Sequence, residues 1–421
     1  MVEALLVGIF ICGYAAVAFE HRIGINKTAT VLIMAVVSWM IVAGQHVYSG
    51  DFSRIVSAFN GHLQEIAQII IFLLGAMTIV AAIEAHHGFK VVVDCIRTHN
   101  KRLLLWIVSF ITFFLSSVLD NLTTAIVMVT LLPRLLEHRQ ERLIFASMIV
   151  VAANAGGAWS PIGDVTTTML WIGERITTVQ VIKLLFIPSI ISLLVPLIYF
   201  SFSLDRQPAA PQLRHAPLAH GGKRVFFLGV SALIAVPVIR ACTHLPPFVG
   251  ILLGVGVLWV VLDVMHPSEE ELRIPHIMSK IDLPSILFFL GLLLTIAALE
   301  VSGILHYCAL ALDKTIGNTD IIGMLLGLVS AIIDNVPLTA AAMGMYSVHA
   351  FPVNAKLWEL LAFGVGTGGS ILIIGSAAGV VVMGIEKITF TWYIRKISGP
   401  VLIGYFAGAV SFLVLYGIIG G

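Results

Sequence analysis

Long apolar stretches separated by short polar turns run through almost the whole chain, and this pattern predicts a helical membrane protein. A helix that spans a bilayer needs about 20 predominantly apolar residues. The chain should therefore be an all-α polytopic membrane protein with many crossings. The apolar stretches lie at residues 4–20, 28–44, 66–86, 103–136, 143–172, 186–203, 225–240, 247–264, 284–304, 320–349, 357–385 and 399–418.

Four of these stretches do not fit a single straight helix. Residues 103–136, 143–172 and 320–349 are too long for one span and too short or too polar for two, and 357–385 is long and rich in glycine. We interpret 103–136 and 320–349 as re-entrant hairpins, which enter and leave on the same side. The other two stretches are interpreted as broken transmembrane helices.

The two halves of the chain resemble each other, with three matching blocks in the same order and a nearly constant offset. Each half contains five net crossings, and an odd number inverts the second half relative to the first. Inverted-topology repeats are typical of secondary transporters. The expected division is a first repeat at 1–202, a polar connecting loop on the cytoplasmic side at 203–224 and a second repeat at 225–421. The matching blocks are FLLG at 72–75 with FFLG at 288–291, Asp120-Asn121 with Asp334-Asn335, and glycines 156, 157 and 163 with glycines 368, 369 and 375.

Composition supports this class and excludes others. Hydrophobic residues make up 59% of the 421 residues and charged residues only 11%, against about 25% charged in a soluble domain. A soluble enzyme, a nucleic-acid binder and a disordered chain are therefore excluded, and the net charge of +1 offers no attraction to nucleic acid. The four cysteines stand far apart, without the spacing of a disulfide framework or a zinc site. No enzyme activity and no cofactor are expected.

The distribution of basic residues predicts the orientation. With the two hairpins returning to their own side, 18 of the 24 lysines and arginines fall on one side of the membrane and 6 on the other. The richer side should be cytoplasmic. Both termini then face away from the cytoplasm, which means the periplasm if this is a bacterial inner-membrane protein.

The first candidate site is the Asp-Asn pair at the middle of each predicted hairpin. Asp120-Asn121 occurs in SSVLDNLTT, and Asp334-Asn335 occurs in SAIIDNVPLT. An ionised Asp in hydrocarbon costs roughly 3 kcal/mol even on a lenient scale, so each carboxylate should face a watery cavity or an ion. Asp-Asn also favours simple turns, but its occurrence at equivalent positions of both halves indicates a functional tip.

The second candidate site is the interrupted stretch ANAGGAWSPIGDVTTT at 153–168. Glycines and a proline break the helix there, and freed carbonyls at membrane depth are tolerated only where they line protein or a cavity. Asp164 adds a carboxylate, and the hydroxyls of Thr166 and Thr167 follow it. In the second half Ser376 stands where Asp164 stood. A loop between two short helices is the simpler alternative.

The ligands in both candidate sites are all oxygen atoms, which suits a hard cation rather than zinc or copper. Burial favours the protonated form of a carboxyl group. Na⁺ and H⁺ would then compete for the same carboxylate, and exchange of one ion for the other would follow from that competition.

A third group of polar residues lies outside these motifs. Glu84 and Glu300 occupy equivalent positions near the ends of two matching helices, and His62 and Glu65 lie on the same helix as Glu84. These residues are candidates for pH sensing or a proton path. The simpler alternative is that they are interfacial side chains in contact with water.

At residues 120–124, 154–167 and 330–335 the chain resembles the NhaD-type sodium/proton antiporters of the ion transporter superfamily, and the resemblance extends over essentially the whole sequence. It implies a scaffold domain and a transport domain with two opposed hairpins, usually in a homodimer that works by an elevator-like mechanism. It also implies that Na⁺ or Li⁺ is exported while H⁺ is taken up.

The resemblance further implies which residues hold the ions. Asp120 and Asp164 would alternate between H⁺ and Na⁺, with Asn121 as a further Na⁺ ligand. The first half of the implied site comprises Asp120, Asn121, Thr124, Asn154, Asp164, Thr166 and Thr167. The second half comprises Ser330, Asp334, Asn335, Thr339, Ser370 and Ser376.

The main alternative is a sodium-coupled dicarboxylate symporter of the same superfamily. Hairpin tips in those relatives resemble Ser-Asn-Thr, whereas Asp120 and Asp334 stand here in place of the serine. A fixed negative charge disfavours an anionic substrate, and no Lys or Arg lies inside the broken segments to bind one. A passive channel is a further alternative, although an inverted repeat with unequal halves favours alternating access.

Overall fold

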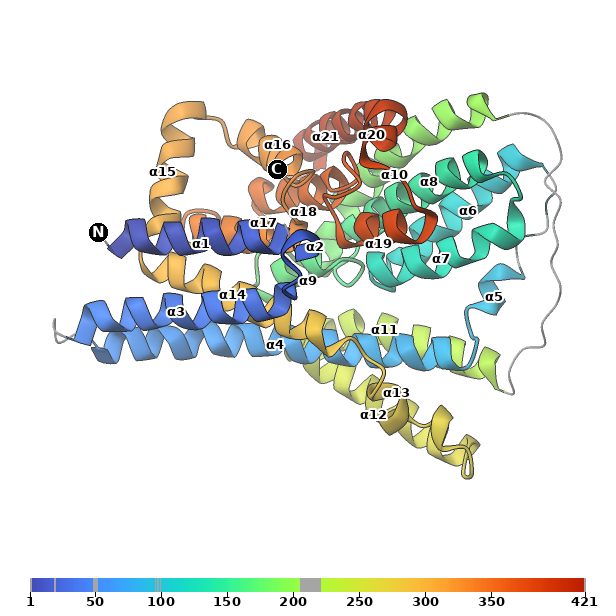
Figure 1. Ribbon diagram of the computed structural model, residues 1–421, viewed down its shortest axis with the longest axis horizontal. Helices are drawn as coiled ribbons and strands as arrows, with labels where there is room; N and C mark the ends of the chain where they lie inside the picture. Colours follow the sequence, from blue (N-terminus) through green and yellow to red (C-terminus); the bar gives the residue numbers. More distant parts are fainter. Residues whose placement is uncertain are drawn as a thin grey trace.

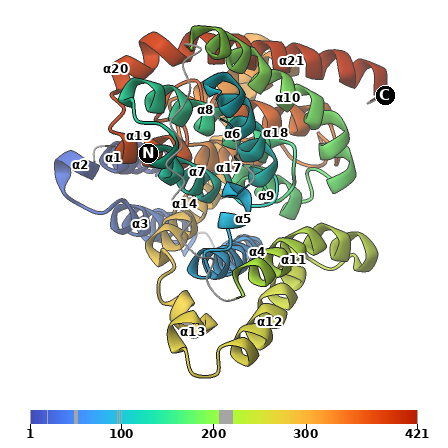
Figure 2. The ribbon, with the colours of Figure 1, turned by 90° about the vertical axis from the view of Figure 1, so that its right-hand side faces the viewer.

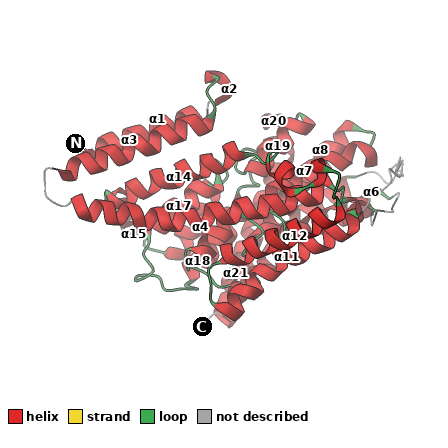
Figure 3. Cartoon of the chain, turned by 90° about the horizontal axis from the view of Figure 1, so that it is seen from below, coloured by secondary structure: helices red, strands yellow, loops and turns green. Residues whose placement is uncertain are grey.

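The computed structural model describes residues 2–18, 20–47, 52–94, 96, 98, 100–204 and 221–419. Helices without any strand make up its regular structure in this part of the chain, as Figure 3 shows. Most of the expected connecting loop at 203–224, from 205 to 220, lies outside the described residues. The helices of the first half are α1 (Val2–Ala18), α2 (Glu20–Ile23), α3 (Lys27–Val47), α4 (Phe52–Ala85), α5 (Lys90–Val93), α6 (Lys101–Ser116), α7 (Asn121–Leu135), α8 (Arg139–Ala158), α9 (Val165–Ile172) and α10 (Thr178–Ser203).

The second half contains a similar series of helices in the same order. Two elements are not α-helical: η1 is a short 3₁₀ turn, and η2 is a π-helical turn leading into α21. The elements are α11 (Gly222–Thr243), α12 (Pro247–Met265), η1 (Glu270–Leu272), α13 (Ile274–Met278), α14 (Leu283–Val301), α15 (Ile304–Ile316), α16 (Thr319–Val329), α17 (Asn335–Met345), α18 (Lys356–Gly368), α19 (Ala377–Glu386), α20 (Phe390–Tyr393), η2 (Ile394–Ser398) and α21 (Gly399–Ile419).

Eight helices within the described ranges are long and apolar enough to cross a membrane. The chain is therefore a multi-pass membrane protein, as its apolar pattern predicts. Shorter apolar helices lie among them, including α7, α16 and α19. Their lengths of 10–15 residues are too small for a full crossing.

Each of the four stretches that did not fit one helix forms two helices with a break between them. Residues 103–136 form α6 and α7, and 320–349 form α16 and α17. Residues 143–172 form α8 and α9, and 357–385 form α18 and α19. The break in each case lies at the predicted Asp-Asn pair or glycine cluster, so the interruptions are where the sequence places them.

Two helices extend beyond the apolar stretches. Helix α4 begins at Phe52, before the apolar stretch 66–86, because the polar residues before Ile66 continue the helix for several more turns. Residues 304–316, between two apolar stretches, form the amphipathic helix α15. Polar residues on one face of a helix lower its mean hydropathy without breaking it.

The helices form two groups of contacts. Helix α3 packs against α14 and α1, while α4 packs against α12, α14 and α11. In Figures 1 and 2, α3 and α4 run side by side, α11 lies beside α4, and α12 lies below them. The second group contains α6–α10 and α16–α21, in which α8 touches α6, α7, α18 and α19. The two groups meet where α14 contacts α17 and α4 contacts α9.

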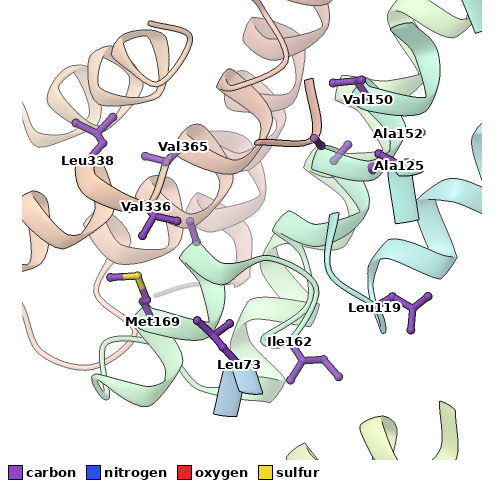
Figure 4. Packing of buried hydrophobic residues seen from close by; sticks show 14 of the residues in the cluster. Leu73, Leu119, Ala125, Val150, Ala152, Ile162, Met169, Val336, Leu338 and Val365 are labelled. Carbon is purple, nitrogen blue, oxygen red and sulfur yellow. The ribbon is translucent and has the colours of Figure 1, made fainter. Parts of the chain in front are cut away.

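Apolar side chains surround the breaks in the second group. Figure 4 shows Leu119 and Ile162 beside the breaks of the first half, and Val336 and Val365 beside those of the second. All four are buried. This packing keeps the broken segments in one arrangement, so the polar groups at their ends hold fixed positions.

Candidate functional site

The first hairpin tip is organised by Asp120. This residue caps the N-terminus of α7, with Oδ1 accepting a hydrogen bond from the Thr123 backbone N–H at 2.8 Å and Oδ2 accepting one from the Thr123 hydroxyl at 2.5 Å. Asp is favoured at this position because its side chain satisfies a free helical N–H group. The cap turns the next residue, Asn121, toward the protein interior, where it is buried.

Asp164 has the same role in the broken helix of the first half. Helix α8 ends at Ala158, and α9 begins at Val165 with the Asp164 carboxylate accepting from the Thr166 N–H at 3.1 Å. Asp164 is only 2% exposed. In the second half Ser376 caps α19 by accepting from the Gly379 N–H at 3.2 Å. Asp164 and Ser376, which the sequence places at matching positions, therefore both cap the N-terminus of a helix, one with a carboxylate and the other with a hydroxyl.

Glycines allow the broken helix to approach the hairpin closely in both halves. A Cβ added at Gly156 would lie 2.1 Å from Phe113 O, and one added at Gly368 would lie 1.9 Å from Gly327 O. Each hairpin also bonds to its broken helix. The Ser116 hydroxyl donates to Ala153 O at 2.6 Å, and the Ser330 hydroxyl donates to Val365 O at 2.8 Å.

A hydrogen-bond network joins the hairpin tip to the break. The Asn121 amide donates to Asp164 Oδ2 at 2.9 Å and to Asn154 Oδ1 at 3.0 Å. The Asn154 amide in turn donates to the hydroxyls of Ser370 at 2.8 Å and Ser376 at 2.9 Å. Asn154 is fully buried and therefore links the first half of the site to the second.

The second hairpin reaches the same carboxylate through Asn335. Its amide nitrogen lies 3.5 Å from Asp164 Oδ2. Turned by 180°, the amide instead donates to Gly375 O at 2.9 Å and to Asp334 Oδ1 at 3.2 Å, and its oxygen then faces Asp164. The second orientation satisfies more groups and places two oxygen atoms beside each other, which is an arrangement that a proton or a cation can bridge.

Three buried hydroxyl oxygens at the site have no hydrogen-bond partner. They belong to Thr124, Thr166 and Thr339, and all three side chains are 0% exposed. Thr124 lies on α7, Thr166 on α9 and Thr339 on α17, so each comes from a helix that starts at a break. Unpartnered buried polar atoms are rare in native proteins and call for a ligand, an ion or a water.

The partial charges at the helix ends that meet in this site do not determine whether the site is positive or negative. Each hairpin and each broken helix brings one helix C-terminus and one helix N-terminus to the centre, and these carry partial charges of opposite sign, roughly half a charge each. The partial charges cancel in pairs. The carboxylates of Asp120, Asp164 and Asp334 therefore make the centre negative. Lys and Arg side chains donate no hydrogen bond to these three carboxylates within the described residues.

The structure brings together most, but not all, of the predicted site residues. Thr167 bonds its own helix start, with its hydroxyl donating to Asp164 O at 2.9 Å. His62, Glu65, Glu84 and Glu300 lie on α4 and α14, outside the group of broken helices. Glu65, Glu84 and Glu300 are exposed, and no hydrogen bond within the described part of the chain joins them to Asp164.

Two tyrosines at the site were not identified from the sequence. The Tyr14 hydroxyl, on α1, accepts a hydrogen bond from the Asp334 N–H at 3.3 Å. The Tyr393 hydroxyl donates to Ser370 O at 2.7 Å. Tyr14 comes from a helix far from Asp334 in the sequence, and an isolated tyrosine in an apolar helix gives no signal of its own. Ser116 could have been found, because it matches Ser330 in the aligned sequence blocks of the two halves.

Comparison with known proteins connects this geometry to transporters. The sequence model of the family described as "Citrate transporter" (CitMHS) matches residues 14–361. The chain is 48% identical to "Sodium/proton antiporter 1" of Arabidopsis thaliana, covering 99% of this chain and 72% of that protein. It is 47% identical to "Sodium/proton antiporter 2" of the same plant, covering 98% of this chain and 99% of the relative.

Bacterial proteins show the same relationship at greater distance. The chain is 29% identical to the "Na(+)/H(+) antiporter NhaD" of Alkalimonas amylolytica, and the alignment covers 97% of this chain and 89% of the relative. The similarity to the NhaD-type antiporters expected from the motifs is therefore confirmed over almost the whole chain.

Proposed function

We propose that this chain, which belongs to the citrate transporter family CitMHS, exchanges Na⁺ or Li⁺ for H⁺ across a membrane. The proposal is supported by its similarity to sodium/proton antiporters over nearly its whole length. Its physiological direction would be export of the metal ion and uptake of the proton. Its partners would then be Na⁺, Li⁺ and H⁺, together with the lipid bilayer around it.

The observation that carries this proposal is the buried oxygen cluster around Asp164. The amides of Asn121 and Asn335 lie beside this carboxylate, and Asn154 joins the cluster through its hydrogen bond with Asn121. The unpartnered hydroxyls of Thr124 and Thr166 lie on helices that start there. Carboxylate, amide and hydroxyl oxygens are ligands for a hard cation. Asp120 and Asp334 flank the cluster and add to its negative charge.

The same cluster accounts for exchange rather than simple binding. Asp164 is buried, so an ionised carboxylate there needs a counter-charge, which either a Na⁺ ion or a proton supplies. The two ligands exclude each other at one carboxylate. A protein that changes its accessible side only when this group is neutralised exchanges one ion for the other.

The architecture that we propose for this cycle is an elevator. The helices α6–α10 and α16–α21 would form the transport domain, and the helices around α3, α4 and α14 the scaffold. Its supports are the equivalent order of helices, the Gly156 and Gly368 contacts, and the Ser116 and Ser330 bonds in the two halves. We further propose two inverted repeats with re-entrant hairpins, a homodimer, and both termini on the non-cytoplasmic side.

The description of the family as citrate transporters raises the alternative of a citrate or dicarboxylate transporter. A carboxylate substrate needs positive groups, but the centre carries three Asp side chains. Lys27 at the start of α3 acts electrostatically on Asp334, but within the described residues no Lys or Arg side chain donates a hydrogen bond to the three carboxylates. The geometry therefore favours a cation over citrate.

Transport by the purified protein tests this function directly. The protein is reconstituted in liposomes with an acidic interior, and internal pH is followed after external Na⁺, Li⁺, K⁺ or citrate is added. We expect alkalinisation with Na⁺ or Li⁺, absent from protein-free liposomes. Uptake of radiolabelled citrate without any Na⁺-driven pH change would show that the citrate alternative is right.

A further inference from the structure

Helix α18 carries a buried carboxyl group that the exchange site does not use. Glu359 is 0% exposed, and both of its carboxyl oxygens lack a hydrogen-bond partner among the described residues. Glu359 lies outside the Asp-Asn and glycine motifs of the sequence, so it was not predicted as a site residue. A charged, unpaired carboxylate is too costly to bury, so this carboxyl group is expected to be protonated in the conformation seen here.

The surroundings of Glu359 offer no fixed counter-charge. The nearest cation on its own helix, Lys356, is already paired with Asp320 at 2.6 Å. Helix α18 packs against α8, α9, α10, α16, α17 and α21. No ion pair or hydrogen bond within the described residues joins Glu359 to a titratable side chain of these elements or of the adjoining loops. Those side chains include Asp164, Glu174, Arg175, Lys183, Tyr199, Asp320, Asp334, Tyr346, His349, Tyr405, Tyr416 and, at the far end of α8, Arg139, Glu141 and Arg142.

The position of Glu359 on α18 links it to the ion site. Gly366 lies seven residues later, which is two turns, so the two residues share one face of the helix. A Cβ at Gly366 would lie 3.0 Å from the Ala158 side chain and 3.9 Å from Asn154 O. The face that carries Glu359 therefore meets the Asn154 segment about 10 Å further along the helix.

A water-sized void lies in the same region. It has a volume of about 10 Å³ and borders Ala155, Ser192, Thr367 and Tyr405, which is close to the space of one water molecule. Ala155 follows Asn154 directly, and Thr367 is on α18. The hydroxyls of Ser192, Thr367 and Tyr405 are the kind of partners that a bridging water needs.

The first half of the chain has no such group. The repeat offset of 212 residues places Ser147 of α8 at the position of Glu359, and the Ser147 hydroxyl donates to its own helix at Leu143 O, 2.8 Å away. The buried carboxyl group is thus a feature of one half only. Helix packing alone does not require it, because the equivalent helix packs with a self-satisfied hydroxyl.

We propose that Glu359 is a second proton-binding site, which passes protons between the non-cytoplasmic side and Asp164. The inference rests on the proposed exchange function and the proposed orientation, in which the start of α18 faces away from the cytoplasm. Neither Glu359 nor Asp164 borders the void, so the transfer runs through a chain of water molecules of which the void holds one. The Glu359 O–H bond breaks as its proton moves to the first water, each water accepts one proton and gives up another, and the last water forms the O–H bond on Asp164 when Na⁺ leaves. Glu359 regains a proton from water on the outer side.

Two transport assays separate this role from a structural one. Glu359→Gln keeps the size and neutral charge of the protonated side chain, but it cannot release a proton. We expect E359Q to lose at least tenfold in Na⁺/H⁺ exchange while keeping ²²Na⁺/Na⁺ exchange, which moves no net proton, within twofold of the wild type. Glu359→Asp should retain Na⁺/H⁺ exchange with an altered pH profile.

The matched control is Glu174→Gln, which removes an exposed carboxylate in the loop after α9 and should change neither assay. Wild-type rates for E359Q in both assays would overturn the proposal. Equal loss of both assays in folded E359Q and E359D would overturn it too, because that result indicates a structural role. Absence of Na⁺/H⁺ exchange in the wild type would contradict the proposed function, and the role of Glu359, which depends on that function, would be contradicted as well.

Discussion

The Asn121 amide at the first hairpin tip donates a hydrogen bond of 2.9 Å to Oδ2 of Asp164 at the break between α8 and α9. This single bond connects the two sequence motifs that carry the exchange chemistry. Because the bond is direct, a change in the charge of the Asp164 carboxylate changes the hydrogen bonding of Asn121 at the hairpin tip.

Replacing Asp164 by Asn should abolish exchange and leave the protein folded. Asn also caps a helix N-terminus well, so α9 should begin at the same residue, and the amide has nearly the shape of the carboxylate. It cannot alternate between H⁺ and Na⁺. Na⁺-driven pH change in proteoliposomes should fall at least about 100-fold, while thermal unfolding in detergent changes little; exchange at the wild-type rate would contradict the role of Asp164.

Replacing Thr166 by Val separates ligand binding from stability. The Thr166 hydroxyl is buried without a partner, and leaving such a group unsatisfied costs about 1–3 kcal/mol. The isosteric T166V should therefore be as stable as the wild type or more so. If the hydroxyl binds the ion, the Na⁺ concentration that gives half-maximal exchange should rise about tenfold, whereas an unchanged Na⁺ dependence would show that the hydroxyl is not a ligand.

Replacing Gly156 by Ala should destabilise the protein strongly. The added Cβ would overlap Phe113 O, a backbone atom that cannot move alone, and overpacking of this kind costs about 1–3 kcal/mol. The matched control is Gly384→Ala on α19, where no atom lies within 4 Å of the added Cβ. Thermal unfolding should show a large decrease for G156A only; equal stabilities would contradict the close packing of α6 against α8.

Acid should destabilise the structure through His86, which follows the end of α4. Burial lowers the pKa of this histidine; the Ala82 carbonyl opposes the shift, and the nearby His266 adds to it. The folded state then binds fewer protons than the unfolded state, so this contribution to stability is fully present above the ordinary pKa of about 6.5 and is lost as the pH falls below it. Exposed His87 on the same turn and Glu269 beside His266 also face this region.

Thermal unfolding from neutral to acidic pH measures this effect. His86→Leu should show a smaller loss of stability on acidification than the wild type, because it has no ring to protonate. His87→Leu, at the exposed neighbour, serves as the control and should behave like the wild type. Identical pH dependence for wild type and H86L would show that His86 does not contribute.

The helical class, the breaks and the central motifs could be predicted from the sequence because each has a local cause. Glycines and Asp-Asn pairs interrupt apolar runs, and Asp164 stands at a helix start that its side chain can cap. The pairing of Asn121 with Asp164 follows only partly, since it requires the two motifs to meet in space. The repeat indicated this meeting but did not fix the donor and acceptor.

Other features depend on tertiary packing and had no local signal. Tyr14 reaches the second hairpin tip from a helix more than 300 residues earlier in the chain. Glu359 looks in sequence like an ordinary polar residue near a helix start, and only its complete burial distinguishes it. The start of α4 at Phe52 and the helix α15 lie outside the apolar stretches, because polar residues in amphipathic helices resemble loops when hydropathy alone is considered.

The most direct test of the account is whether Na⁺ binding displaces a proton from Asp164. Purified protein in detergent and weak buffer is titrated with NaCl while the solution pH is recorded, with choline chloride as the control for ionic strength. The account predicts saturable proton release on Na⁺ addition that is present in the wild type and absent in Asp164→Asn. Saturable Na⁺ binding without proton release, or the same release from the Asn variant, would contradict it.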